Sequence, residues 1–449
     1  MIKPNKIIVI GGNAAGPAAA AKAKRVNPAA EVILFEIGDF ISTGTCEIPY
    51  VLSGAIADYK KIIYFTAEEF YKKKNVKVFT NHLVEKIGRK EKALTVKNLK
   101  KNSVTNYFYD KLILATGSVS KELKDFSSNL NNVYYLKSVS DLLEIQKRNN
   151  DAKIKNVVII GAGYIGLEAA EAFSHLGINV IILEKEIRPL PSADPEIQYL
   201  VDELLKQNNI RFYQIHKNFK IQIENNSVKN INLDSRLLEF DIVLVAAGFL
   251  PNVKLAKDSG LEIETNGAIK VDSKLRTSDQ HIYAAGDNIT VVNFITGRAD
   301  YIPLATIAHE FGHIAGENAA GGNKTALPVV KNIAVKIFNK YYVQVGLSDT
   351  EIKKGKYLVA EVSAVVPNLV EVMPGSEKVF GKIIFEKNNK RILGASFFGG
   401  KEVSGYGDLI SALIKTKQDV RVLASLNYNY TPPLSPFVNL LSVLGRQIK

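Results

Sequence analysis

NVVIIGAGYIGLEAAEAFSHLGINVIILE, residues 156–184, is the stretch that decides the fold. It begins with an apolar run, Asn156–Ile160, and continues through Gly161-Ala162-Gly163-Tyr164-Ile165-Gly166 into a helix-favouring segment. It ends in a second apolar run, Asn179–Glu184. A strand, a glycine turn, a helix and a second strand in this order are typical of a dinucleotide-binding unit. The stretch therefore predicts an α/β fold built on a parallel sheet.

Each glycine of this turn has its own physical role. Gly161 permits the tight turn, Gly163 lets the backbone approach a pyrophosphate, and Gly166 lets the helix pack closely on the strand. The helix N-terminus adds N–H donors for the phosphates. Glu184 ends the second strand, where a carboxylate accepts hydrogen bonds from a ribose diol and repels a 2′-phosphate. NADH is therefore favoured, while two basic residues shortly after Glu184 keep NADPH as an alternative.

The same pattern occurs once more near the N-terminus. Lys6–Ile10 is predicted as a strand, Ala14–Val26 as an alanine-rich helix, and Glu31–Glu36 as a strand that ends in an acid. The turn between the first strand and the helix is Gly11-Gly12-Asn13-Ala14-Ala15-Gly16, in which Asn13 stands where the second glycine is expected. We interpret the two copies as an internal duplication, so two nucleotide cofactors are expected.

Further strand ends and a distinct C-terminal segment complete the pattern. An apolar strand runs into Ala115-Thr116-Gly117, a second is followed by Gly248, and a third by Gly286-Asp287, where an acid can bind a ribityl or phosphate group. From about Leu327 no glycine fingerprint occurs. Short strands and one helix near Asp408–Thr416 predict a separate α+β domain there.

Cys46 is the only cysteine in 449 residues. A lone thiol cannot form a disulfide within its own chain. If Cys46 is catalytic, it must pair with an external thiol or sulfur species, or cycle through a sulfenic acid. One cysteine also excludes a disulfide framework, fits a reducing cytoplasm, and leaves no Cys/His spacing that suggests a metal site.

Length and charge limit the remaining classes of function. A chain of 449 residues is expected to form two or three domains, and it has no run of 18 apolar residues, so no membrane span is expected. The formal net charge is +13. Its lysines are spread along the chain without a basic block, so we do not expect nucleic-acid binding; an anionic substrate is the functional alternative.

Together, these motifs resemble the FAD- and NAD(P)H-dependent pyridine nucleotide-disulfide oxidoreductases, over essentially the whole chain and in the family's order. The resemblance implies an FAD-binding domain from residues 1–118 and 253–326, and an NAD(P)H-binding domain at 119–252. It also implies an α+β dimerisation domain at 327–449, and hence a homodimer. The fold implied is two Rossmann-like domains plus this third domain.

The single cysteine narrows the resemblance. Ser42-x-x-x-Cys46-x-Ile48-Pro49-Tyr50 is similar to the single-cysteine branch, which contains coenzyme A-disulfide reductases, persulfide or polysulfide reductases, and NADH oxidases and peroxidases. The oxidases and peroxidases usually carry a histidine in the first glycine loop, where this chain has Asn13 and Ala14. A disulfide or sulfur substrate is therefore favoured. An NADH oxidase or peroxidase, and a flavoprotein that reduces a protein partner, remain alternatives.

The resemblance also assigns roles to individual residues. Cys46 is the redox-active thiol, with Ser42 and Tyr430 of the partner subunit as hydrogen-bonding groups. A coenzyme A substrate would have its phosphates bound by three cations: Lys22, Arg25 and Lys74. The cofactor-binding residues, for FAD and NADH or NADPH, are Gly11, Gly12, Asn13, Ala14, Ala15, Gly16, Glu36, Val84, Ala115, Thr116, Gly117, Gly161, Gly163, Tyr164, Ile165, Gly166, Glu168, Glu184, Gly248, Gly286, Asp287, Leu304 and Ala305.

Two positions depart from the family pattern. Glu47 follows the cysteine where relatives usually have glycine, and a carboxylate there should oppose thiolate formation. Met373 precedes Pro374-Gly375 where many relatives have a tyrosine. Both departures weaken the assignment of coenzyme A disulfide as the substrate, and neither affects the cofactors.

Overall fold

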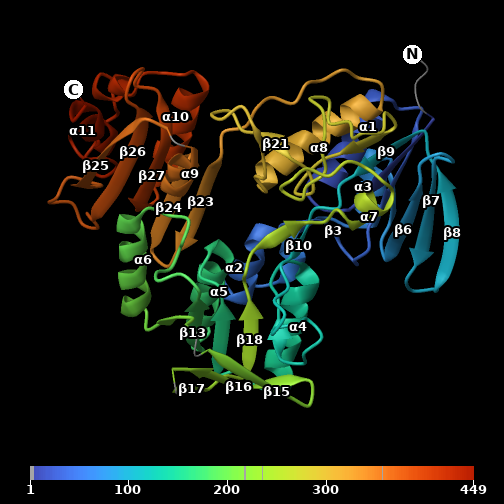
Figure 1. Ribbon diagram of the computed structural model, residues 1–449, viewed down its shortest axis with the longest axis horizontal. Coiled ribbons are helices and arrows are strands. Elements are labelled where there is room, and N and C mark those ends of the chain that lie inside the picture. The colour runs from blue at the N-terminus through green and yellow to red at the C-terminus, as the bar shows by residue number, and fades with distance from the viewer. Residues whose placement is uncertain (1–4, 217–218, 235, 356, 449) are drawn as a thin grey trace.

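Three five-stranded sheets organise the chain in the computed structural model, which describes residues 5–216, 219–234, 236–355 and 357–448 (Figure 1). Two of the sheets are parallel and the third is antiparallel. The parallel sheets confirm the predicted Rossmann-like α/β architecture, and each contains one of the two glycine turns.

The first parallel sheet has the order β20-β9-β1-β2-β5. Its strands are buried on both faces, which explains their continuous apolar sequences. Helices α1 and α8 pack together beside it (Figure 1), because a side chain at Gly312 or Gly316 of α8 would collide with the α1 backbone. The elements are β1 (Lys6–Ile10), α1 (Ala15–Val26), β2 (Glu31–Phe35), β5 (Lys77–Phe79), β9 (Lys111–Leu114), β20 (Ile282–Ala284) and α8 (Ala305–Ala319).

The second parallel sheet has the order β11-β18-β12-β13-β14 and repeats this plan. In both sheets the strand before the glycine turn pairs with the strand after the helix, in the registers Ile8↔Ile33 and Val158↔Ile181. The elements are β11 (Val133–Tyr134), α4 (Val139–Asp151), β12 (Asn156–Ile160), α5 (Tyr164–His175), β13 (Asn179–Glu184), α6 (Pro195–Gln207), β14 (Arg211–Gln214) and β18 (Ile242–Val245).

The third sheet is antiparallel, in the order β23-β24-β27-β26-β25. Its segment contains three helices among the described residues, whereas the sequence pattern predicted one, which begins earlier than expected. The other two have seven residues each, too few for a helical period to be recognised. The elements are β23 (Asn332–Ile337), β24 (Lys340–Gly346), α9 (Asp349–Gly355), β25 (Val359–Pro367), β26 (Lys378–Glu386), β27 (Ile392–Gly399), α10 (Val403–Lys415) and α11 (Leu440–Arg446).

Smaller elements connect these sheets. In the part of the chain that the structure describes, no helix is long and apolar enough to cross a bilayer. The connecting strands are β3 (Ile41–Thr43), β4 (Ile63–Phe65), β6 (His82–Gly88), β7 (Ala93–Asn98), β8 (Ser103–Phe108), β10 (Ser118–Ser120), β15 (Lys220–Glu224), β16 (Ser227–Leu233), β17 (Arg236–Leu238), β19 (Phe249–Pro251), β21 (Val291–Val292) and β22 (Ala299–Asp300), and the helices are α2 (Ile48–Leu52), α3 (Ala67–Lys74) and α7 (Lys254–Asp258).

The segment around Cys46 joins the first two units. A 3₁₀ turn, Thr45–Glu47, runs directly into α2, whose second residue is Pro49. The apolar side chains of α2, among them Ile48 and Leu52, are buried in the same core as residues of α4 and α5. Figure 1 shows α2 beside α5, at the centre of the molecule. Cys46 is thereby fixed between the two glycine turns.

Candidate active site

A cavity of about 1000 Å³ lies between the two glycine turns. Its walls come from all three units, because residues 331 and 333–335 of the C-terminal segment contribute to one side. The predicted site residues that line it are Gly11, Gly12, Asn13, Ala14, Ala15, Glu36, Cys46, Val84, Ala115, Thr116, Gly117, Tyr164, Ile165, Glu168, Gly286, Asp287, Leu304 and Ala305.

The first glycine loop fits a dinucleotide. Gly11 has a φ of +108°, and a Cβ there would lie 2.1 Å from the Ala115 carbonyl oxygen. A Cβ on Gly16 would lie 1.8 Å from the Gly11 carbonyl oxygen, so Gly16 serves close packing and does not line the cavity. The loop backbone is thus held tight against β9, and this side of the cavity is left to a ligand.

Two acids mark the ends of this cavity. Glu36 accepts hydrogen bonds from the Gly12 and Gly38 N–H groups, at 2.6 and 2.7 Å, and burial raises the pKa of its carboxyl despite these bonds. Burial also raises the pKa of Asp287, which accepts a hydrogen bond from the Ser118 hydroxyl at 3.3 Å. Both carboxyls are suited to bind hydroxyl donors of an elongated cofactor such as FAD.

A neighbouring cavity of about 510 Å³ is built on the second glycine turn. Gly161, Gly163, Glu184 and Gly248 line it, and the Glu184 carboxylate accepts a hydrogen bond from the Ala162 N–H at 2.8 Å. A Cβ on Gly163 would have nothing within 4 Å. The backbone at Gly163 therefore faces open space, as binding of a pyrophosphate requires.

Tyr164 lies on the wall that the two cavities share. Its ring stacks on Tyr342 with the centroids 6.3 Å apart, and its hydroxyl is 3.3 Å from the Ser192 hydroxyl. Ile165 also lines both cavities. A nucleotide bound at the second turn would therefore reach the larger cavity by displacing the Tyr164 ring.

Cys46 is exposed to the larger cavity, in surroundings that disfavour its thiolate. The pKa of its thiol is raised, first by desolvation and then by the carboxylates of Glu47, Glu168 and Asp287. The ammonium of Lys137 acts in the opposite direction. The protein alone thus keeps Cys46 as a thiol, and additional positive charge or a bound cofactor is needed to activate it.

Glu168 lies on α5, one turn after Tyr164. Burial raises the pKa of its carboxyl from 4.5 to about 7, with a further contribution from Glu171, and Lys336 opposes the shift. Glu171 itself forms an ion pair with Lys336 and accepts a hydrogen bond from the Phe338 N–H at 2.6 Å. Near neutral pH, Glu168 can therefore gain or lose a proton inside the cavity.

Lys137 is a site residue that the sequence did not indicate. Its ammonium donates to the Ser118 hydroxyl at 2.9 Å and lies 4.3 Å from the centre of the Phe249 ring. Burial lowers its pKa, and Asp287 is the strongest opposing charge. Because Lys137 follows no recognisable motif and its partners are distant in sequence, no signal in the chain could have identified it.

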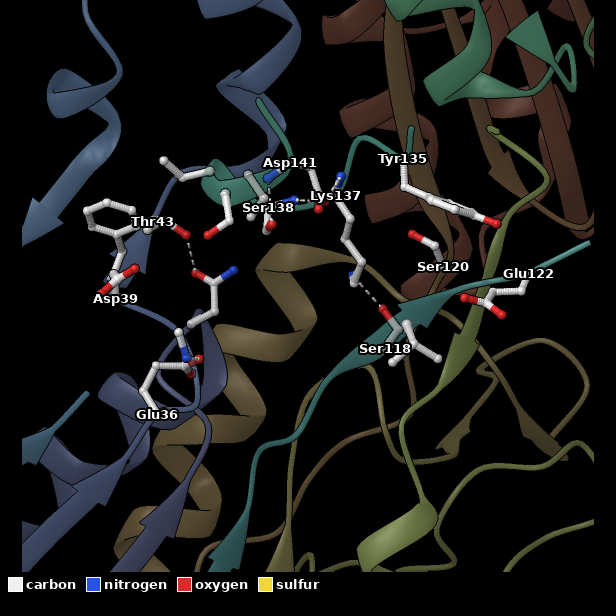
Figure 2. Close-up of a pocket in the computed structure, with 17 residues that line it drawn as sticks. Glu36, Asp39, Thr43, Ser118, Ser120, Glu122, Tyr135, Lys137, Ser138 and Asp141 are labelled. Atoms are coloured by element: carbon white, nitrogen blue, oxygen red, sulfur yellow. Dashed lines mark hydrogen bonds between the residues drawn. The ribbon is translucent and has the colours of Figure 1, made fainter. Parts of the chain in front are cut away.

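Lys137 also borders a third cavity, of about 460 Å³, which Figure 2 shows in close-up. This cavity lies between the loop after β2 and the start of α4. Besides Lys137, its polar wall consists of hydroxyl groups and carboxylates: Glu36, Asp39, Thr43, Thr45, Ser118, Ser120, Glu122, Tyr135, Ser138, Ser140 and Asp141.

Several predicted residues lie outside these cavities. Ser42 has a φ of +51° and is bound through its N–H to the Gly12 carbonyl at 2.7 Å, next to the cavity but not among its lining residues. Lys22 forms an ion pair with Glu317 at 3.0 Å, Arg25 is exposed, and the Lys74 ammonium lies 5.8 Å from the centre of the Phe65 ring.

Tyr430 also lies apart from the thiol of its own chain. Its side chain is 48% exposed on the C-terminal unit and contacts Phe437 edge-to-face, with the ring centroids 5.4 Å apart. It is not among the residues that line the Cys46 cavity. Within one chain, Tyr430 and Cys46 are therefore not brought together.

Known proteins resemble this chain over its full length. The family profile described as pyridine nucleotide-disulphide oxidoreductase matches residues 5–312. The NAD(P)H coenzyme A polysulfide/persulfide reductase of Pyrococcus horikoshii is 31% identical over 99% of this chain and 98% of its own. The coenzyme A disulfide reductase of Staphylococcus aureus is 28% identical over 99% of this chain and 100% of its own.

Solved structures agree with these relatives. The reduced CoADR-RHD of Bacillus anthracis superposes with a TM-score of 0.94 at 29% identity, covering 100% of this chain and 80% of the other. The water-forming NADH oxidase of Lactobacillus brevis has a TM-score of 0.91 at 27% identity, covering 98% of this chain and 97% of the other.

Proposed function

Because the chain belongs to the pyridine nucleotide-disulphide oxidoreductase family, we propose that it is an FAD-dependent NAD(P)H oxidoreductase that reduces a small disulfide or sulfur compound through Cys46. The substrate class is coenzyme A disulfide, coenzyme A persulfide or polysulfide, as in the relatives named above. One observation carries the proposal: the only cysteine of the chain opens onto the cavity between two nucleotide-binding turns.

The cofactors divide between the two turns. Bound FAD supplies the transfer of two electrons from reduced nicotinamide to sulfur. The first loop and Asp287 hold the flavin nucleotide, while the second loop and Glu184 hold NADH in preference to NADPH. The Tyr164 ring covers the nicotinamide position until the nucleotide displaces it, and Glu168 positions the nicotinamide. The domain division 1–118 with 253–326, 119–252 and 327–449 is supported by the fact that each five-stranded sheet draws its strands from one of these three parts.

The sulfur chemistry takes place at Cys46. Its thiolate attacks one sulfur of the acceptor, the S–S bond of the acceptor breaks, and the leaving thiolate takes the electron pair and then a proton. Lys137 supplies positive charge near the thiolate. Ser42 and Tyr430 of the partner subunit donate hydrogen bonds to sulfur. Lys22, Arg25 and Lys74 bind the phosphates of a coenzyme A substrate, after Lys22 exchanges its ion pair with Glu317 for a phosphate contact.

A homodimer is part of the proposal. The C-terminal unit exposes large apolar side chains, which is a feature of association surfaces. These side chains are Val365 (57% exposed), Val372 (87%), Leu434 (72%) and Phe437 (79%). A second copy that covered them would also bring its Tyr430 into a shared interface. We infer a cytoplasmic location from the single free thiol alone.

An NADH oxidase is the second candidate, favoured by the similarity to the Lactobacillus brevis enzyme. The composition of the first glycine loop weighs against it. Asn13 there accepts a hydrogen bond from the Thr43 hydroxyl at 3.2 Å, and its side-chain amide cannot act as an acid–base group toward a sulfenic acid as a histidine can.

Replacement of the thiol tests the proposal. We expect Cys46→Ser to retain FAD and its reduction by NADH, and to lose turnover of coenzyme A disulfide and polysulfide. NADH consumption is measured under nitrogen with each sulfur acceptor, and under air without one. Full sulfur reduction by the variant would refute the proposal and favour a reductase for a protein partner. Rapid oxygen consumption by the parent enzyme without a sulfur acceptor would favour the oxidase.

A further inference from the structure

The carboxylate of Glu47 is fixed beside the thiol of Cys46. Both residues belong to the same 3₁₀ turn, Thr45–Glu47. The Tyr64 hydroxyl donates a hydrogen bond to Glu47 Oε1 at 2.7 Å. The other oxygen folds back over the turn, since a Cβ on Gly44 would lie 2.4 Å from Glu47 Oε2. The negative charge therefore has a defined position at the reacting sulfur.

No cation neutralises this charge among the described residues, where Glu47 forms no ion pair. Glu47 is the first carboxylate to raise the pKa of the Cys46 thiol, ahead of Glu168 and Asp287. The Glu47 hydrogen bond likewise raises the pKa of Tyr64, so the phenol remains a neutral donor. Lys137 is the nearest opposing charge, and burial weakens it by lowering its pKa. An acceptor that reaches Cys46 therefore meets a net negative environment.

We propose that Glu47 selects sulfur acceptors by charge, favouring those whose reacting S–S bond is flanked by neutral groups and disfavouring those that carry negative charge next to the reacting sulfur. The inference rests on the proposed function, because it concerns the acceptor of the same thiol. It names the preferred class: sulfur carried at the end of an uncharged arm, with any anionic groups far from the sulfur.

The two substrate candidates differ in this property. In coenzyme A disulfide, a long neutral amide arm separates the S–S bond from the phosphates. An inorganic polysulfide carries its charges on the sulfur chain itself. In both reactions the Cys46 thiolate forms a new S–S bond, the old S–S bond breaks, and the electron pair leaves on the departing sulfur. Only with polysulfide does a charged sulfur approach the Glu47 carboxylate.

Alkylation of reduced Cys46 tests the inference without turnover. Iodoacetamide and iodoacetate attack by the same chemistry, but only iodoacetate is anionic. We expect the ratio of the iodoacetamide rate to the iodoacetate rate to fall roughly fivefold in Glu47→Gln, as removal of one nearby charge implies. The amide keeps an acceptor for Tyr64, and any change in the thiol pKa cancels in the ratio. The difference should vanish in about 1 M salt. Glu91→Gln, in the exposed turn between β6 and β7, is the matched control and should leave the ratio unchanged.

Turnover then connects this selectivity to substrates. In the flavin-loaded enzyme, kcat/KM for polysulfide relative to coenzyme A disulfide should rise by a similar factor in Glu47→Gln. An unchanged alkylation ratio would overturn the inference even if both compounds are substrates. If neither compound is reduced by the parent enzyme, the proposed function fails, while the alkylation ratio still decides whether Glu47 selects by charge.

Discussion

At the scale of single residues, Lys137 determines how reactive Cys46 can be. It is the one cation that lowers the pKa of the thiol against the combined effect of burial and three carboxylates. We expect Lys137→Met, which keeps the length of the side chain, to raise this pKa and to slow alkylation of Cys46 by iodoacetamide severalfold at neutral pH.

The control for this prediction is Lys153→Met, which removes an exposed lysine before β12. It should leave the pH profile of alkylation unchanged. A profile for Lys137→Met that coincides with the parent would mean that the ammonium does not act on the thiol.

Glu168 should make stability depend on pH. Because its pKa rises from 4.5 to about 7 on folding, the native state holds this proton more tightly than the unfolded state. Stability therefore falls as pH rises from about 4.5 to 7, by roughly 3 kcal/mol once the carboxyl is ionised. Glu168→Gln lacks this penalty. In flavin-free protein, the Tm of the variant relative to the parent should increase through this interval and stay constant above it.

An exposed carboxylate serves as the comparison. Glu310→Gln on α8 should show a Tm difference from the parent that does not change between pH 4.5 and 7. A flat difference for Glu168→Gln as well would show that this carboxyl is ionised at no cost.

The chain reveals residues of this kind only in part. The glycines and terminal acids of the two turns follow from spacing, because backbone geometry demands them at fixed positions. Lys137 and Tyr64 do not, because their contacts with Ser118 and Glu47 depend on how distant segments fold together. Ser42 shows the converse: the motif predicts a residue near the thiol but not its backbone conformation.

At the scale of elements, two glycines of the second turn should respond differently to the same substitution. A Cβ on Gly166 would lie 2.0 Å from the Gly161 carbonyl oxygen, whereas one on Gly163 would meet nothing within 4 Å. We expect Gly166→Ala to destabilise the protein by about 3 kcal/mol or more. Gly163→Ala should keep the parent Tm and raise KM for NADH.

Thermal unfolding and NADH titration separate these two effects, and each variant controls for the other. A loss of stability in Gly163→Ala, or an unchanged KM, would contradict the assignment of the open space to a pyrophosphate.

The repeated unit was predictable because a glycine turn, an apolar strand and a helix each leave a local pattern. The C-terminal unit was less so. Its strands are recognisable, but α9 and α11 have seven residues each and are stabilised mainly by packing, as Ile352 and Leu444 are buried in their cores. Pairing of β10 with β19 joins residues more than a hundred positions apart, and no local pattern records it.

At the scale of the whole molecule, the site looks incomplete within one chain. The cavity that holds Cys46 draws walls from all three units, yet Tyr430 projects from the C-terminal unit into solvent beside Phe437. Burying the exposed apolar side chains of that unit against a second copy would explain both their exposure and the position of Tyr430.

Complementation between two inactive chains tests this arrangement. Cys46→Ser should be inactive because it lacks the thiol, and Tyr430→Ala should be impaired because it deprives the partner's thiol of its phenol. If Tyr430 serves the other subunit, a co-expressed hybrid dimer contains one site with both groups intact, and sulfur reduction should reappear. Adding Phe437→Asp to both chains should abolish this rescue by separating the subunits, as sedimentation velocity would show. Hybrids that stay inactive while remaining dimeric would place the action of Tyr430 within its own chain, or remove it from the chemistry altogether.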